Sequence, residues 1–80
     1  MGVGERIRVK IPQATVYNAQ GGNPALSILK QDSSKKAYLE LDSVLKIAGP
    51  IEIIQGVECV KVTYSNNEMY IPIQSVKTYS

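Results

Sequence analysis

The sequence predicts an all-β domain, folded as a small barrel of five to six short antiparallel strands. Short stretches of alternating apolar and polar residues recur along the chain, and this alternation is the pattern of a strand with one buried face. Clusters of Gly, Pro, Asn, Asp and Ser separate these stretches and supply the turns. Eighty residues can bury one hydrophobic core, so residues 1–80 are expected to form a single domain.

The first quarter of the chain predicts two strands and a loop. Residues 6–11 alternate apolar and basic side chains, which indicates a half-buried strand with a basic outer face. Pro12 interrupts this strand because it lacks a backbone N–H. Residues 14–17 form a second short extended piece. Residues 18–24 follow as an exposed loop, since they contain Gly21-Gly22-Asn23-Pro24.

The segment from 25 to 48 contains one real ambiguity. Residues 25–30 are a mixed apolar run, and the polar residues 31–36 form a second loop. In residues 37–48 the apolar side chains fit a helical spacing, but the first of them also alternate as in a strand. Asp42-Ser43 is typical of a bend between two strands. We therefore favour two strands over a helix here.

The next break is at Gly49-Pro50, followed by an apolar strand over residues 51–54 and a Gln55-Gly56 turn. The best-defined element is a hairpin of residues 58–64 and 68–73, joined by Ser65-Asn66-Asn67, whose asparagines tolerate positive φ. One face should enter the core, with Val60, Val62, Tyr64, Met69, Ile71 and Ile73. The opposite face should carry Cys59, Lys61, Thr63, Glu68, Tyr70 and Pro72.

The C-terminal third resembles SH3 and bacterial SH3-like domains, which close with an aromatic residue, Ile or Phe, a Pro, and a Val four residues later. Tyr70-Ile71-Pro72 followed by Val76 has this pattern. Residues 58–62 stand where such domains carry acidic, Trp, aromatic, Lys and apolar residues. Residues 14–17 are similar to the first strand, which lines the ligand groove. The resemblance implies an SH3-like barrel.

Two residues depart from the family pattern. Cys59 replaces the Trp that stacks on proline in the peptide-binding members, and Met69 replaces the Gly that commonly precedes the closing aromatic. Without that Trp, a polyproline helix loses its largest flat contact surface. By analogy, relatives bind cell-wall peptides, serve as adaptors, or join phage and multisubunit assemblies. Fold alone does not choose among these functions.

Composition argues against most catalytic and metal chemistry. The chain has no histidine, which removes the usual triads and the commonest general base. One cysteine forms no internal disulfide and leaves a zinc site without its ligands. Glu40 and Asp42 are expected to lie on a solvated outer face. We therefore expect no enzyme activity and no cofactor, and a cytoplasmic location because no signal-like or membrane-spanning segment is evident.

The expected function is a non-catalytic interaction module, an adaptor or an assembly or host-directed binding protein, that binds a protein partner. Its surface should combine aromatic anchors with a charged rim. The predicted partner-binding residues are Tyr17, Cys59, Lys61, Tyr70 and Pro72. The alternative interpretation of Cys59 is an inert packing residue, and that of the tyrosines is a cover for the barrel edges.

The alternative function is nucleic-acid binding by a small barrel. Nine Lys and Arg against seven Asp and Glu give a net charge of only +2, so charge alone does not select this function. The candidate residues are Arg6, Arg8, Lys10, Lys35 and Lys36. Basic side chains on an edge strand also prevent edge-to-edge aggregation, which needs no ligand. An exposed edge strand can equally pair two copies into a homodimer.

Overall fold

The computed structural model describes residues 2–79, which form eight β-strands and one turn of 3-10 helix. The strands are β1 (Arg6–Val9), β2 (Gln13–Thr15), β3 (Lys30–Gln31), β4 (Ala37–Glu40), β5 (Val44–Ile54), β6 (Val57–Tyr64), β7 (Asn67–Pro72) and β8 (Val76–Thr78). The 3-10 turn, η1 (Ile73–Ser75), lies between β7 and β8. The prediction of an all-β fold is confirmed. No helix within residues 2–79 is long and apolar enough to cross a membrane.

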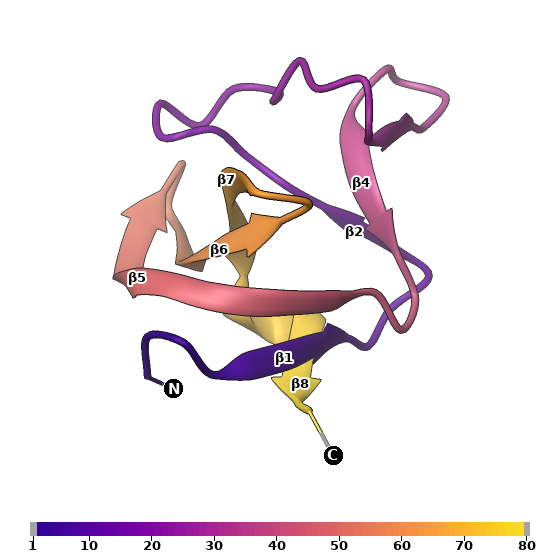
Figure 1. Cartoon of the computed structure of the whole chain (residues 1–80). Coiled ribbons are helices and arrows are strands. Elements are labelled where there is room, and N and C mark those ends of the chain that lie inside the picture. Colours follow the sequence, from indigo (N-terminus) through magenta and orange to yellow (C-terminus); the bar gives the residue numbers. More distant parts are fainter. Residues whose placement is uncertain (1, 80) are drawn as a thin grey trace.

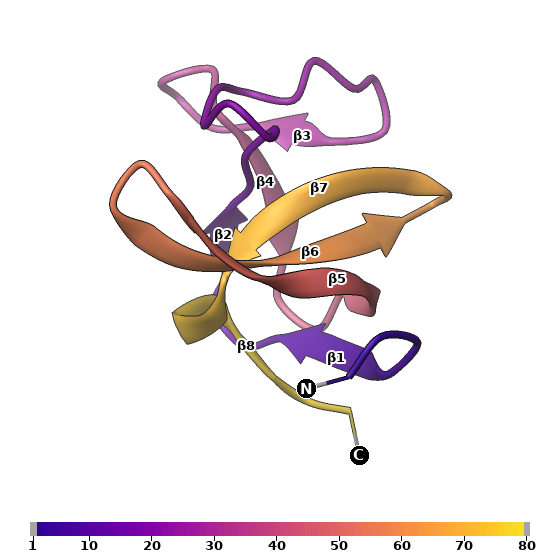
Figure 2. The same cartoon turned by 90° about the vertical axis from the view of Figure 1, so that its left-hand side faces the viewer.

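The strands form two antiparallel sheets that enclose one main core. The larger sheet has the order β7-β6-β5-β1-β8, and the smaller has the order β2-β4-β3. Figures 1 and 2 show β2 and β4 crossing one side of the larger sheet, with β1 and β8 at the bottom of both views. A bridge between Tyr17 and Tyr70 joins the segment after β2 to β7, which gives the fold its barrel-like shape.

The strands predicted over residues 37–48 are confirmed. β4 ends at Glu40, and β5 begins at Val44 after a turn in which the Ser43 N–H donates to the Glu40 carbonyl at 3.1 Å. Asp42 has a φ of 70°, a conformation that Asp tolerates better than most residues. A helix does not form because the alternating side chains Ala37 and Leu39 both enter the core.

The break expected at Gly49-Pro50 is wrong, because β5 continues through it. The pairing with β6 shifts between Ile47 and Ile51, so Gly49 and Pro50 lie in an irregularity inside one long strand. Pro50 has no N–H to donate, which a regular ladder does not tolerate. At Gly49 a Cβ would lie 3.1 Å from Cδ of Lys61, so glycine lets the lysine stem pack closely over the strand.

The predicted hairpin is confirmed, with a tighter turn than expected. Ser65 and Asn66 have φ values of 50° and 65°, which is the two-residue turn that matches the twist of antiparallel strands. Asn67 already belongs to β7. The register pairs Val62 with Met69, and both side chains are buried in the main core. The turn at Gln55-Gly56 between β5 and β6 also has positive φ at both residues.

The mixed apolar run of residues 25–30 is mostly a turn rather than a strand. Only Lys30 is in a strand, because the Leu29 N–H donates to the Leu26 carbonyl at 3.1 Å and closes a turn after Pro24. Leu29 is buried and Leu26 packs against the core, whereas Ile28 is 43% exposed. The other core residues come from both sheets: Ile7, Val9, Ala14, Val16, Ala37, Leu39, Leu45, Ile47, Val60, Val62, Met69, Ile71 and Val76.

Candidate functional site

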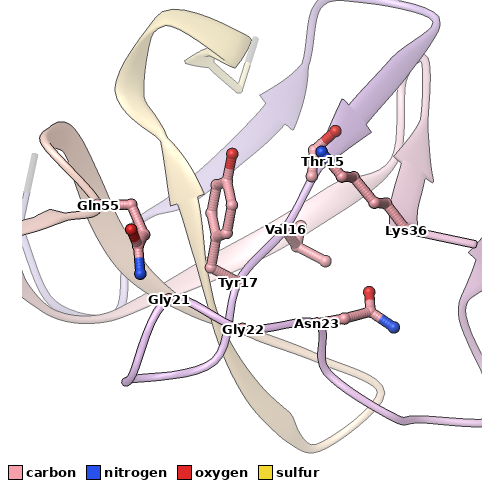
Figure 3. Close-up of a pocket in the computed structure, with 8 residues that line it drawn as sticks. All are labelled: Thr15, Val16, Tyr17, Gly21, Gly22, Asn23, Lys36 and Gln55. Carbon is pink, nitrogen blue, oxygen red and sulfur yellow. The ribbon is translucent and has the colours of Figure 1, made fainter. Parts of the chain in front are cut away.

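A pocket of about 290 Å³ lies beside Tyr17, and we call it the tyrosine pocket. Its lining residues are Thr15, Val16, Tyr17, Gly21, Gly22, Asn23, Lys36 and Gln55. Figure 3 shows the Tyr17 ring among these residues, with Gln55 and Lys36 on opposite sides of it. The lining comes from β2, the loop after it, the turn before β4 and the turn between β5 and β6. The pocket is therefore built where three separate parts of the chain meet.

Backbone hydrogen bonds hold Tyr17 against β7. The Tyr17 N–H donates to the Tyr70 carbonyl and the Tyr70 N–H donates to the Tyr17 carbonyl, both at 2.8 Å. Two residues that exchange both N–H···O bonds in this way are the hydrogen-bonded pair of an antiparallel ladder. Tyr17 is half-buried, and its side chain packs against a small second cluster made of Ile54, Cys59 and Tyr70. The wall of the pocket is consequently part of the barrel itself.

The loop after β2 is held in shape by Asn18. Its side-chain oxygen accepts from the N–H of Gln20 at 3.0 Å and from the N–H of Gly22 at 2.8 Å. Asparagine often organises turns in this way because its side chain imitates a backbone carbonyl. Gly21 has a φ of +86°, and a Cβ there would lie 2.4 Å from Cγ of Gln55. The positive φ favours glycine at this position, and any Cβ there would also force the Gln55 side chain to move.

Two further hydrogen bonds tie the loop to the rest of the pocket. The Ala37 N–H donates to the Asn23 side-chain oxygen at 2.6 Å, which fixes the loop against β4. The Gln55 side-chain amide donates to the Gln20 carbonyl at 3.4 Å, a longer contact that links the β5–β6 turn to the loop. The pocket is therefore largely formed before any ligand arrives, which lowers the entropy cost of binding.

The structure gives the predicted partner-binding residues different surroundings. The register places Lys61 opposite Tyr70 and Cys59 opposite Pro72. Tyr17 and Pro72 are half-buried and reachable. Lys61 is also half-buried and pairs with Glu68 at 3.4 Å.

The prediction that Cys59 contacts a partner is wrong, because its exposure is 0% and it has no surface to offer a partner. Tyr17 and Ile54 pack against it, so the burial fits the alternative interpretation of Cys59 as a packing residue. Burial raises the pKa of the Cys59 thiol through desolvation of the thiolate. The cysteine is thus an inert packing residue.

Tyr70 is also less available than the sequence suggested. Only 8% of it is exposed, and its hydroxyl donates to a carboxylate oxygen of Glu52 at 3.0 Å. This hydrogen bond is the main cause that raises the pKa of Tyr70, and desolvation of the ionised phenol is the second. Tyr70 therefore supports the pocket from behind, while Tyr17 faces the ligand space.

The predicted nucleic-acid residues fall into separate places. Arg6 and Arg8 lie on the outer face of β1, whereas Lys35 and Lys36 belong to the turn before β4. β1 is at the bottom of Figures 1 and 2 and this turn is at the top, so the two groups do not form one surface. Lys10 follows the end of β1, where its N–H donates to the Ser75 carbonyl at 2.9 Å.

Sequence reasoning missed Asn23 and Gln55 as lining residues, because neither belongs to a recognisable motif. It also placed Lys36 with the nucleic-acid candidates rather than beside Tyr17. The signal at Gly21-Gly22 was interpreted only as a turn. Within residues 2–79 no group of three or more acidic or thiol side chains is placed to hold a metal ion.

Comparison of the chain with protein-family models, curated proteins and solved structures finds no match. The fold and its surfaces define a small all-β domain of barrel-like shape.

Proposed function

We propose that this chain is a non-catalytic interaction module of the SH3-like kind, which binds a short segment of a protein partner in the tyrosine pocket. One observation carries the proposal: a pocket walled by the Tyr17 ring, whose loop is held by backbone N–H groups that donate to the side-chain oxygens of Asn18 and Asn23. Tyrosine is a frequent anchor in interfaces because it offers a large apolar ring and a hydroxyl with few rotatable bonds.

The size of the pocket favours a peptide over a cofactor. A volume of about 290 Å³ is at the lower end of small-molecule sites, so it accommodates one or two side chains of a partner. Thr15, Asn23 and Gln55 add polar groups around the ring. A partner segment would place an apolar side chain against Tyr17 and bond its backbone to these groups.

Lys36 indicates the charge of the partner segment. It is exposed at the pocket, and among the ion pairs of residues 2–79 none includes it. An unpaired cation at the rim of an interface favours an acidic group on the partner and speeds association. The preferred segment therefore carries an Asp or Glu next to an apolar residue.

The SH3-like part of the proposal is supported by the position of the residues that carry the resemblance. Tyr70, Ile71 and Pro72 end β7, and Val76 begins β8 after the η1 turn. The Ala14–Tyr17 segment, similar to a groove-lining first strand, includes three residues of the pocket. Adaptor, assembly and host-directed roles all use a surface of this type, and the partner would decide among them.

A peptide-display experiment tests the proposal. A library of random peptides of about 12 residues is selected on the immobilised protein, and enriched peptides are then measured in solution. We expect acidic, apolar-containing peptides whose affinity falls at least about tenfold in Lys36→Glu, because the rim charge is reversed. Lys35→Glu is the matched control, since Lys35 has the same charge but does not line the pocket.

Three results would contradict binding in the tyrosine pocket. If no peptide is enriched above background, or if enriched peptides bind Lys36→Glu as well as the wild type, the tyrosine pocket is not the binding site. A Tyr17→Ala variant that melts like the wild type but keeps full affinity leads to the same conclusion.

A further inference from the structure

The outer face of the larger sheet gathers four cations that are dispersed in the sequence. Arg6 lies directly opposite Lys46 on β5, and Arg8 lies directly opposite Lys77 on β8. Directly opposite residues of antiparallel strands point to the same face, and so do residues two apart on one strand. Their neighbours along β1, Ile7 and Val9, are fully buried on the inner face. We call Arg6, Arg8, Lys46 and Lys77 the basic face.

The basic face is not explained as protection of a sheet edge. β1 lies between β5 and β8 in the sheet, so Arg6 and Arg8 belong to an interior strand. The interpretation that their charge prevents edge-to-edge aggregation is therefore wrong, since β1 has no free edge. Of the basic face, only Lys77 lies on an edge strand, β8, where a charged side chain can oppose edge-to-edge pairing.

The basic face is also not neutralised by acidic side chains. The ion pairs within residues 2–79 join Lys30 to Glu40 and Lys61 to Glu68, and neither involves the basic face. Instead, both of its cross-strand pairs combine like charges, and like charges directly opposite each other destabilise a sheet. An arrangement that costs stability at two adjacent places is a sign of a functional surface.

Tyr79 positions the two arginines. The guanidinium of Arg6 lies 4.5 Å from the centre of the Tyr79 ring, and that of Arg8 lies 4.8 Å from it. Both distances are within the range of a cation–π interaction. The ring holds the guanidinium groups near each other without removing their charge. Arg8 donates one N–H to the Asp42 backbone carbonyl at 3.5 Å, and a guanidinium has further N–H groups for an anion.

A shallow hollow of about 320 Å³ adjoins the basic face. Arg6 and Lys46 line it, together with hydroxyl and amide groups from Thr63, Ser65 and Asn66. None of its lining residues is acidic. Arg, Lys, Ser, Thr and Asn are the side chains that make most phosphate contacts in protein complexes with nucleic acids.

We propose that the basic face and this hollow bind the phosphodiester backbone of a nucleic acid. Successive phosphates present charges at regular intervals, and the cations of the basic face are spaced by about 5 Å across strands and about 7 Å along β1. A single phosphate ion would occupy only one of these intervals. The proposal is independent of the tyrosine pocket, because the loop beside that pocket lies at the opposite end of the molecule (Figures 1 and 2).

Fluorescence anisotropy with labelled oligonucleotides of about 20 nucleotides tests this proposal. Single-stranded and duplex DNA and RNA are titrated with the protein between 50 and 200 mM salt. Four phosphate contacts predict a slope of log K against log salt of about −3.6 for duplex DNA and about −2.8 for single strands. Affinity should therefore fall about 150-fold and about 50-fold, respectively, over this range. Comparing the affinities for single-stranded and duplex DNA and RNA shows which nucleic acid the protein prefers.

Two double variants with the same change of net charge locate the site. In Lys46→Gln with Lys77→Gln, we expect at least about a tenfold loss of affinity and a slope smaller by about 1.8 units for duplex DNA. In Lys35→Gln with Lys36→Gln, at the opposite end of the molecule, affinity should change by less than about twofold. Circular dichroism of all variants confirms that the fold is kept.

Three results would overturn the proposal. No binding of any oligonucleotide at about 20 mM salt removes nucleic acid as the ligand. A loss caused by the Lys35 and Lys36 variant instead places the contact at the turn before β4. Binding to vesicles that contain anionic phospholipid, without binding to oligonucleotides, assigns the basic face to a membrane surface.

Discussion

Reversing one charge of the basic face is expected to stabilise the protein, and Lys46→Glu is the substitution that does so. Position 46 lies opposite Arg6 on one side and Thr63 on the other, with Lys61 on the diagonal. A carboxylate there replaces a repulsion by an attraction to Arg6. No acidic side chain lies directly opposite it, because Thr63 separates it from Glu68.

The magnitude follows from the cross-strand separation. Two unit charges about 5 Å apart in water interact by about 0.8 kcal/mol, and screening at about 0.15 M salt leaves roughly half of this. Lys46→Glu replaces this screened repulsion by an attraction of the same size. The folded state should therefore gain twice the screened energy, about 0.8 kcal/mol. For a domain of this size the melting temperature should rise by about 3–6 °C. At about 1 M salt only about a third of this stabilisation should remain, because the Debye length shortens to about 3 Å.

Thermal unfolding followed by circular dichroism at low, physiological and high salt measures this change. Lys30→Glu is the control of opposite sign, because Lys30 pairs with Glu40 at 2.7 Å and its reversal creates a repulsion. We expect its melting temperature to fall, most at low salt. A melting temperature of Lys46→Glu that is unchanged or lower, or a rise that persists at high salt, would refute the electrostatic reasoning.

Three further substitutions and treatments test the pocket and its support. Tyr70→Phe should cost about 1 kcal/mol at pH 7, because the hydroxyl loses its bond to Glu52. The raised pKa of Tyr70 adds stability that is complete below about pH 10 and is lost as pH rises through the folded-state pKa, so alkaline melting curves of the variant should lack this decline. Gly21→Ala should destabilise more than Gly56→Ala: both residues have positive φ, but only the new Cβ at position 21 meets another side chain. A thiol reagent should modify buried Cys59 at least about 100-fold more slowly in the folded protein than in denaturant, and rapid labelling of the native state would contradict its burial.

The fold was predictable wherever local patterns and tertiary packing agree. The β6–β7 hairpin is an example, since its turn asparagine and its alternating valines specify the same register. Gly49-Pro50 was misleading because these residues usually end a strand, whereas here β6 continues the pairing on both sides of the irregularity. That outcome depends on the partner strand and is invisible in local sequence.

The sites were harder to predict than the fold, for a related reason. Cys59 and Tyr70 follow an outward alternation, but Tyr17 comes from another part of the chain and covers them. Lys46 and Lys77 join Arg6 and Arg8 only through strand pairing. Alternation tells which side of a strand a residue occupies; it does not tell which strands are neighbours.

The tyrosine pocket and the basic face differ in where they depart from the most stable structure: the pocket in its loops, and the basic face in its regular strands. This difference supports separate roles for the two surfaces. The tyrosine pocket depends on loops that use positive φ at Gly21 and Gln55, conformations that turns adopt routinely. The basic face occupies regular strands, where opposite charges at Arg6 and Lys46 would have satisfied the same fold with greater stability. Folding alone therefore gives no reason for the like charges, whereas binding of a polyanion does. A variant that becomes more stable and loses oligonucleotide binding in the same step would separate these two explanations, and Lys46→Glu is that variant.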